Sequence, residues 1–141
     1  MNKTDQVTEL YHREQIKELR YRYCHALDQK DFDGVEACFL EKIDVDFGAA
    51  GYFSERDELI KSLKQFAESN PLVGMHQMSN PVFEHLDVLT AKVRWVSNFT
   101  GYDPETLKVT RQMGFVSDEY EKLESGWRIK ACQYQLVLLE S

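Results

Sequence analysis

The 141-residue chain has the length of one domain, and its composition of 43% hydrophobic and 29% charged residues is typical of a globular domain. Its net charge of -7, with no run of Lys and Arg, excludes nucleic acid as a partner, because a phosphate backbone would be repelled. No apolar stretch approaches the roughly 18 residues that cross a bilayer, so we expect no membrane partner.

The cysteines and the first residues indicate a reduced compartment. Cys24, Cys38 and Cys132 lie far apart and lack the CxxC spacing of zinc and redox sites. We expect each to be a small buried residue and not part of a disulfide framework. Residues 1–6 are polar and lack the apolar stretch of a signal peptide. The sequence therefore predicts a cytoplasmic protein.

Helical periodicity dominates up to about residue 70. Residues 8–28 form the first predicted helix, whose apolar stripe consists of Ile16, Leu19, Tyr23, Ala26 and Leu27. A short helix is predicted over 32–39, with Asp31 or Asp33 as its N-cap. A strand over 41–50 follows, with a turn at Gly48 and Gly51. Ser54 is the expected N-cap of a third helix, whose apolar face consists of Leu59, Ile60, Leu63, Phe66 and Ala67.

Period-two alternation dominates the rest of the chain. It predicts four strands, over 75–86, 89–102, 109–122 and 127–139, with Ser125-Gly126 as the last hairpin turn. Helices followed by a run of strands indicate an α+β fold, and the short turns favour an antiparallel meander curled over the helices. No repeat or linker divides residues 1–141, so we expect a single domain.

Three polar residues fall where the pattern points inward: Tyr23 and Asp28 near the end of the first helix, and His76 at the start of a strand. A carboxylate, an imidazole and a phenol in one apolar cavity can move protons on a bound organic molecule. Tyr23 and Asp28 are five residues apart, a rotation of about 140° on an ideal helix, so they flank the stripe and do not stack.

Each of the three also has an ordinary structural interpretation. Asp28 could be solvated or could cap the turn after the helix, His76 could be a satisfied histidine in a sheet, and Tyr23 could be a core residue. Other polar groups carry less information: His12 and His25 are expected to be exposed, His85 lies by a turn, and Asp118 belongs to a solvated strand end. Asp44 and Asp46 lack further ligands, so no metal site is predicted.

Over about residues 8 to 138, the sequence resembles those of SnoaL-like proteins of the nuclear-transport-factor-2-like superfamily, and four features carry the resemblance. They are Ile16-xx-Leu19-xxx-Tyr23-xxxx-Asp28, Asp31-Phe32-Asp33 with Cys38-Phe39, His76 at a strand start, and Gly126-Trp127-Arg128-Ile129. The resemblance implies one SnoaL-like domain over 1–141, a cone-shaped barrel of curved antiparallel sheet wrapped around a long N-terminal helix, with two further short helices and a deep pocket.

Within the superfamily, the spacing is most similar to scytalone dehydratase and bile-acid 7α-dehydratase. That resemblance implies that His76 is the base, that Asp28 orients and charge-stabilises it, and that Tyr23 donates a hydrogen bond to the carbonyl or the departing hydroxyl. The second strand histidine or further acid of those enzymes has no counterpart here; the next strand offers Ser97, Asn98 and Thr100.

We therefore hypothesise a cofactor-independent dehydratase or isomerase that abstracts a proton next to a carbonyl of a small hydrophobic cyclic or aromatic ligand. The expected pocket walls are Phe47, Phe53, Leu63, Phe66, Met75, Met78, Trp95, Phe99, Met113 and Phe115, with Asn98 added if a bulge turns it inward. The alternatives are a non-catalytic ligand-binding protein and a structural β subunit of a ring-hydroxylating dioxygenase.

Exposed apolar strand residues suggest that the open sheet face is covered by another copy. Val96, Val116, Leu136 and Leu138 are the residues expected on that face. A homodimer is the predicted assembly, with a trimer as the alternative.

Overall fold

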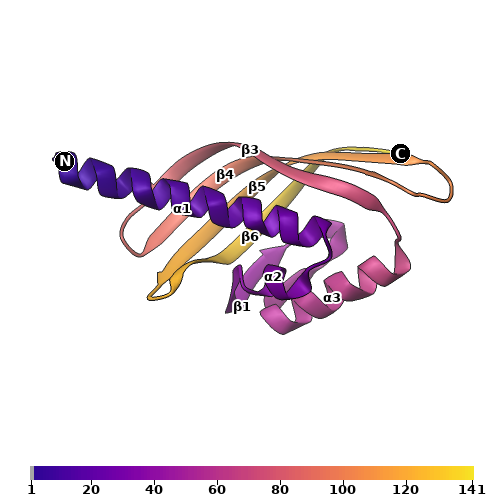
Figure 1. Cartoon of the computed structure of the whole chain (residues 1–141), viewed down its shortest axis with the longest axis horizontal. Helices are drawn as coiled ribbons and strands as arrows, with labels where there is room; N and C mark the ends of the chain where they lie inside the picture. Colours follow the sequence, from indigo (N-terminus) through magenta and orange to yellow (C-terminus); the bar gives the residue numbers. More distant parts are fainter. Residues whose placement is uncertain (1) are drawn as a thin grey trace.

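A computed structural model describes residues 2–141, and Figure 1 shows its helices on one side of a long, curved sheet. The helices are α1 (Lys3–Asp28), α2 (Phe32–Glu36) and α3 (Arg56–Ser69), with a short 3-10 turn, η1 (Gly48–Ala50). The strands are β1 (Phe39–Asp46), β2 (Tyr52–Glu55), β3 (Val73–Leu86), β4 (Thr90–Tyr102), β5 (Val109–Leu123) and β6 (Gly126–Glu140). The α+β class and the curved sheet around a long N-terminal helix are thus confirmed.

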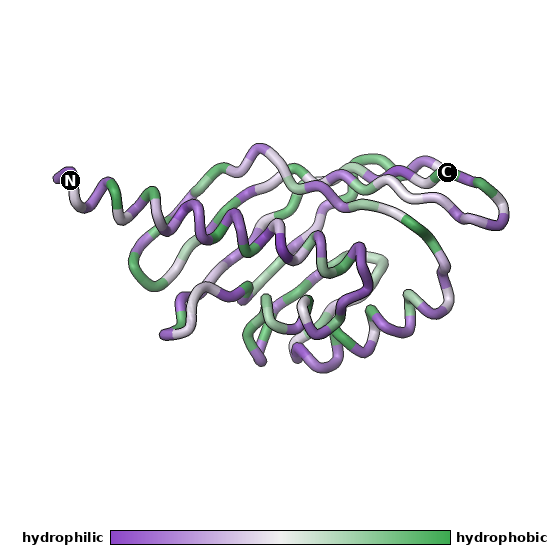
Figure 2. Tube along the Cα trace, viewed as in Figure 1, coloured by the Kyte–Doolittle hydropathy of each residue, from purple (hydrophilic) through white to green (hydrophobic). Residues whose placement is uncertain are grey.

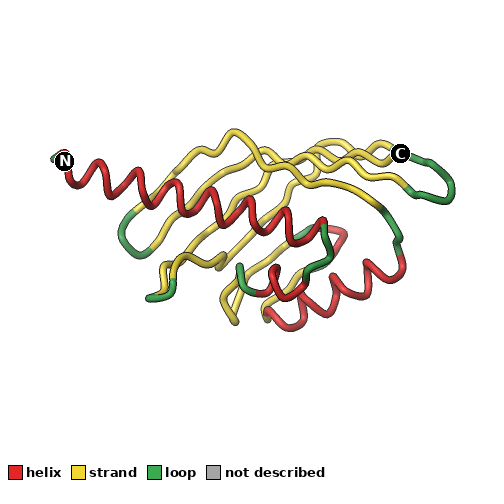
Figure 3. The backbone as a smooth tube through the Cα atoms, viewed as in Figure 1, coloured by secondary structure: helices red, strands yellow, loops and turns green. Residues whose placement is uncertain are grey.

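The long helix α1 crosses the sheet diagonally, and α2 and α3 gather near its C-terminal end (Figures 1 and 3). It begins earlier than residue 8 because Asn2 and Asp5 form a capping box, in which the Asn2 side chain accepts from the Asp5 N–H. It ends at Asp28, where the Lys30 N–H donates to Leu27 O and the Asp31 N–H to Ala26 O. Asp31, one of the two predicted caps, is the N-cap of α2.

The predicted meander is confirmed, and two further strands extend it. The sheet order is β2-β1-β6-β5-β4-β3, and only the β1–β6 pairing among these strands is parallel. The prediction that Ser54 caps the third helix is wrong: Ser54 lies in β2, and Glu55 precedes α3 without a side-chain cap. The four residues of β2 were missed because so short a strand shows almost no alternation.

Alternation along β4 and β5 separates an inner face, packed on α1, from an outer face. The inner face contributes Val93, Trp95 and Val116 to a core that also contains Ile16 and Leu19 of α1. Figure 2 shows apolar and polar residues alternating along both the strands and α1. The expectation that Val116 lies on the open face is therefore wrong, since it is 4% exposed.

On the outer face, the register places Val96 opposite Phe115 and Met113 opposite Leu138. Leu136 pairs with Gly114, which belongs to the inner face, and is exposed because it lies near the far end of β6. Cys24, Cys38 and Cys132 are buried and free, as predicted. No helix within residues 2–141 combines the length and the apolar character that a bilayer crossing requires.

A charged pair lies at the centre of the core, between α1 and β5. Arg20 and Asp118 are 3% and 0% exposed, and Arg20 Nε lies 3.0 Å from Asp118 Oδ2 without the alignment of a hydrogen bond. The Tyr120 hydroxyl donates to the same oxygen at 2.6 Å, and the indole N–H of Trp95 donates to Tyr120 at 3.1 Å. The prediction that Asp118 is solvated is wrong, because strand alternation places it on the inner face beneath Arg20.

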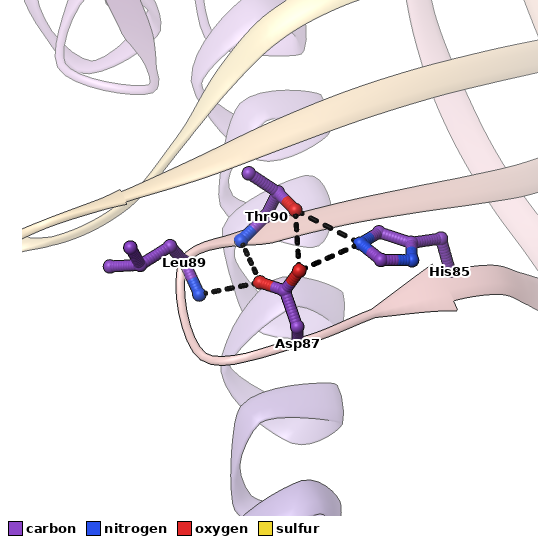
Figure 4. A network of polar contacts seen from close by, with 4 residues as sticks. All are labelled: His85, Asp87, Leu89 and Thr90. Carbon is purple, nitrogen blue, oxygen red and sulfur yellow. Dashed lines mark hydrogen bonds and ion pairs between the residues drawn. The ribbon is translucent and has the colours of Figure 1, made fainter.

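The β3–β4 turn is held by polar contacts around Asp87. Asp87 Oδ1 accepts the backbone N–H groups of Leu89 and Thr90, both at 2.8 Å (Figure 4). Its other oxygen lies 3.0 Å from His85 Nε2 and accepts the Thr90 hydroxyl at 3.1 Å. These bonds, led by the two backbone N–H groups, lower the pKa of Asp87 from 3.8 to about 2.

Replacing Asp118 by Asn keeps the side-chain size but leaves the Arg20 guanidinium buried without its counter-charge. We expect the free energy of unfolding to fall by about 3 kcal/mol or more, because breaking a buried ion pair is costly. Urea denaturation measures this. The control Glu119→Gln, an exposed neighbour, should change stability by at most about 0.5 kcal/mol. A loss for Asp118→Asn no larger than that of the control would contradict the assignment.

Because the pKa of Asp87 is depressed in the folded protein, its ionised form stabilises the fold above pH 3.8, and this contribution disappears as pH falls through about 2. We expect Asp87→Asn to unfold at a lower temperature than the unmodified protein at neutral pH, and the two midpoints to converge near pH 2. Thermal unfolding followed by circular dichroism at several pH values tests this. A difference that stays constant down to that pH would argue against the role of the carboxylate charge.

Candidate active site

Asp28 and His76 meet where the end of α1 contacts β3. The His76 ring nitrogen Nδ1 lies 2.7 Å from Asp28 Oδ1. The backbone N–H of His76 donates to both carboxylate oxygens, at 3.1 Å to Oδ1 and 2.9 Å to Oδ2. The structure therefore brings these two predicted residues together, by three contacts between one carboxylate and one histidine.

These contacts determine the proton arrangement on the imidazole. An ionised carboxylate only accepts hydrogen bonds, so Nδ1 is the nitrogen that carries the proton. In the neutral imidazole, Nε2 then holds a lone pair and is available to a bound molecule. The His76 side chain is 33% exposed and that of Asp28 is 16% exposed, so the imidazole is the more accessible partner.

Phe99 holds the imidazole from the neighbouring strand. The two ring centroids lie 4.5 Å apart, and His76 and Phe99 are directly opposite in the β3–β4 register. Gly74 and Gly101 form a second opposed pair beside them, and a Cβ at either position would lie 2.7 Å from the Phe99 ring. Two glycines thus make the space in which the Phe99 ring lies, and the ring in turn orients His76.

A cavity of about 160 Å³ adjoins this pair, between the end of α1, α3 and the start of β3. Its walls are Leu27, Asp28, Lys30, Phe32, Leu63, Phe66, Ala67, Asn70, Leu72, Gly74, His76 and Phe99. Apolar side chains predominate among them, and Asp28, Lys30, Asn70 and His76 are the polar ones. Leu63, Phe66 and Phe99 are the predicted wall residues that the structure places there.

Tyr23, the third residue of the predicted constellation, lies outside this cavity. It is 6% exposed, its ring is 5.6 Å from that of Phe39, and the Arg20 guanidinium lies 4.6 Å above it. Burial raises the pKa of the Tyr23 phenol well above its ordinary value of 10.0, so the group stays protonated. The rotation between positions 23 and 28 explains the separation: one side chain faces the core while the other faces β3.

The other predicted wall residues also lie elsewhere. Phe47, Phe53 and Met78 pack against the core, and Trp95 is 1% exposed within it. Met75, Met113 and Phe115 are exposed. Asn98 pairs with Met113 in an unbroken register and so lies on the outer face; the bulge that could have turned it inward is absent from the β4–β5 pairing.

Lys30, Phe32, Asn70 and Leu72 line the cavity but were not predicted. Phe32 is the first residue of the short helix α2, and the other three lie in the connections after α1 and α3, where no periodicity reveals the direction of a side chain. The position of Gly74 in the cavity wall could have been predicted from the sequence, since it lies two residues before His76 and therefore on the same face of β3. Within residues 2–141, no group of three or more His, Cys, Asp or Glu side chains is placed to hold a metal ion.

The arrangement has the parts needed for proton transfer. A neutral imidazole with one nitrogen bonded to a carboxylate can accept a proton at the other nitrogen, and the carboxylate stabilises the imidazolium that results. The apolar walls would strengthen both interactions by keeping water away.

Comparisons with known proteins agree with this fold. A structure from Novosphingobium aromaticivorans, provisionally assigned as a scytalone dehydratase, has a TM-score of 0.87 at 19% identity, over 96% of this chain and 90% of that one. A provisionally assigned NTF2-like dehydratase from Streptomyces avermitilis scores 0.81 at 14% identity, over 91% and 98%. A hexachlorocyclohexane dehydrochlorinase from Novosphingobium barchaimii scores 0.84 at 11% identity, over 96% and 92%.

No curated protein matches the chain in sequence. The profile of the SnoaL-like domain, in contrast, matches residues 8–133. That match includes most of α1, both residues of the Asp28–His76 pair and most of the sheet. The protein therefore belongs to the SnoaL-like domain family.

Proposed function

We propose that this protein is a cofactor-independent lyase or isomerase in which His76 and Asp28 transfer protons on a small cyclic substrate. The observation that carries the proposal is the 2.7 Å contact between His76 Nδ1 and Asp28 Oδ1 at the wall of an apolar cavity. The names of structurally similar proteins, two dehydratases and a dehydrochlorinase, support a lyase-type reaction.

In the proposed reaction, His76 Nε2 removes a proton from the carbon next to a carbonyl. The electron pair of the broken C–H bond forms a C=C bond to the carbonyl carbon, and the carbonyl π pair moves onto oxygen to give an enolate, while Asp28 stabilises the imidazolium. The imidazolium then returns its proton to a hydroxyl on the adjacent carbon, which leaves as water as the new double bond forms. If the proton returns to another carbon instead, the same pair performs an isomerisation.

The volume of the cavity gives a scale for the part of the substrate that enters it. An apolar cavity of about 150 Å³ is known to accommodate a single benzene ring. The volume of about 160 Å³ beside His76 therefore favours a substrate with one ring, in contact with Leu63, Phe66 and Phe99. Tyr23 has no part in this proposal, because it packs against Phe39 and beneath Arg20.

Replacing His76 by Gln removes the base, so we expect proton exchange to slow by about 10²- to 10⁴-fold, the usual contribution of general acid–base catalysis. Deuterium exchange next to the carbonyl of monocyclic ketones in heavy water, followed by NMR, measures this without knowledge of the natural substrate. The matched control is His85→Gln in the β3–β4 turn, which should retain the full rate. Equal rates for both variants would reject His76 as the base; ligand binding without any exchange would favour a non-catalytic carrier.

We also propose that the chain forms a homodimer through the outer face of its sheet. Met113, Phe115 and Leu138, between 42% and 54% exposed, lie on neighbouring strands of that face. Contiguous apolar surface of this kind favours association with another protein surface.

Replacing Phe115 by Glu should convert such a dimer to a monomer, because the charge would be buried in the interface without a partner. Light scattering after size-exclusion chromatography measures the mass. Lys64→Glu on α3, away from this face, should leave the dimer intact. A monomeric unmodified protein would refute the proposal.

A further inference from the structure

Lys30 is a cationic residue in the wall of the proposed active-site cavity. It is exposed and contributes to the same walls as Asp28 and His76. No other residue in the described part of the chain forms an ion pair with it. Its ammonium group is therefore free to pair with a charge carried by a ligand.

Among the other polar groups of the cavity, His76 Nε2 is assigned to the proposed proton transfer, and Asp28 and Asn70 have partners within the protein. Both oxygens of Asp28 accept from His76, and the side-chain amide of Asn70 donates to Phe66 O. A ligand with an acidic group would thus meet one unpaired cation at the cavity, while its ring lies among Leu63, Phe66 and Phe99.

The backbone of Lys30 gives an independent reason to look for a role in binding. Its φ of 58° is left-handed, at the position just after a helix end where glycine is normally favoured. The hydrogen bonds from the N–H groups of Lys30 and Asp31 to Leu27 and Ala26 fix this conformation. Glycine would adopt this conformation at lower cost, so the turn itself does not require a lysine at this position.

We propose that Lys30 determines specificity by pairing with a carboxylate on a single-ring ligand of this cavity. The inference rests on the proposed function for the choice of site and adds the chemical class of the substrate, a small cyclic carboxylic acid. The single ammonium of Lys30 balances the one charge of a carboxylate but not the two charges of a phosphate monoester.

Binding of benzoate and benzamide tests the proposal, because the two probes share a ring and differ in charge. We expect benzoate to bind the unmodified protein about fivefold more tightly, the ratio that a favourable partly exposed ion pair gives. Lys30→Met should remove this preference by weakening benzoate alone. Lys64→Met, which removes an equal charge from an exposed position of α3 outside the cavity walls, should preserve it. Calorimetry or ligand-observed NMR gives the affinities.

Three results would overturn the inference: no binding of benzoate, equal affinity for the two probes, or the same loss of preference in both variants. Lys30→Gly provides a second measurement, since it should raise the thermal midpoint by relieving the left-handed residue and still abolish the preference. A lower midpoint for this variant would contradict the backbone argument. These binding measurements do not depend on turnover. A preference for benzoate without proton exchange would therefore reject only the proposed reaction. Proton exchange without the preference would reject only the role of Lys30.

Discussion

The arrangement of the site depends on one carboxylate. Asp28 is the last residue of α1, and it bonds to both the backbone and the ring of His76 on β3. Because the backbone contact fixes the position of the strand and the ring contact fixes the rotation of the imidazole, one side chain sets both. The same acceptor also leaves Nε2 as the free nitrogen. The same residue therefore docks the helix on the sheet and orients the proposed base.

Such a contact is useful only if α1 cannot slide along the sheet. Arg20, eight residues before Asp28 on the same helix, is held by Asp118 of β5 in the centre of the core. A buried ion pair adds little net stability compared with apolar packing, but it strongly disfavours arrangements in which either charge lacks its partner. The pair therefore fixes the position of α1, and the geometry at Asp28 follows from it. On the other side, Phe99 in its glycine-lined space limits the motion of the imidazole.

The sequence was sufficient to predict the class of fold, the order of the main elements and the two residues that meet at the cavity. Long segments with strong periodicity, such as α1 and the strands from β3 to β6, allow this because burial of one face dictates the pattern. The parallel β1–β6 pairing and the short β2 could not be predicted, since they depend on long-range packing and not on local pattern.

The prediction that placed Tyr23 in the cavity was wrong because helical rotation separates it from Asp28. Asp118 was assigned to solvent because acidic neighbours masked its inward position in the alternation. Lys30 and Asn70 escaped notice because they lie in connecting segments.

The position of β3 in the sheet gives the Asp28 contact another consequence. β3 is an outermost strand of fourteen residues, long enough to act as a template for the strand of another molecule. The N–H of His76 points away from β4 and would be open to such pairing if Asp28 did not occupy it. Further along, the register shift between Ser79 and Val82 and the missing N–H of Pro81 interrupt the same edge. An Asp28→Ala protein would therefore be expected to expose this edge and to leave His76 without its orienting carboxylate, and its inactivity would mix two causes. Substitutions at His76 keep the edge covered and separate chemistry from aggregation.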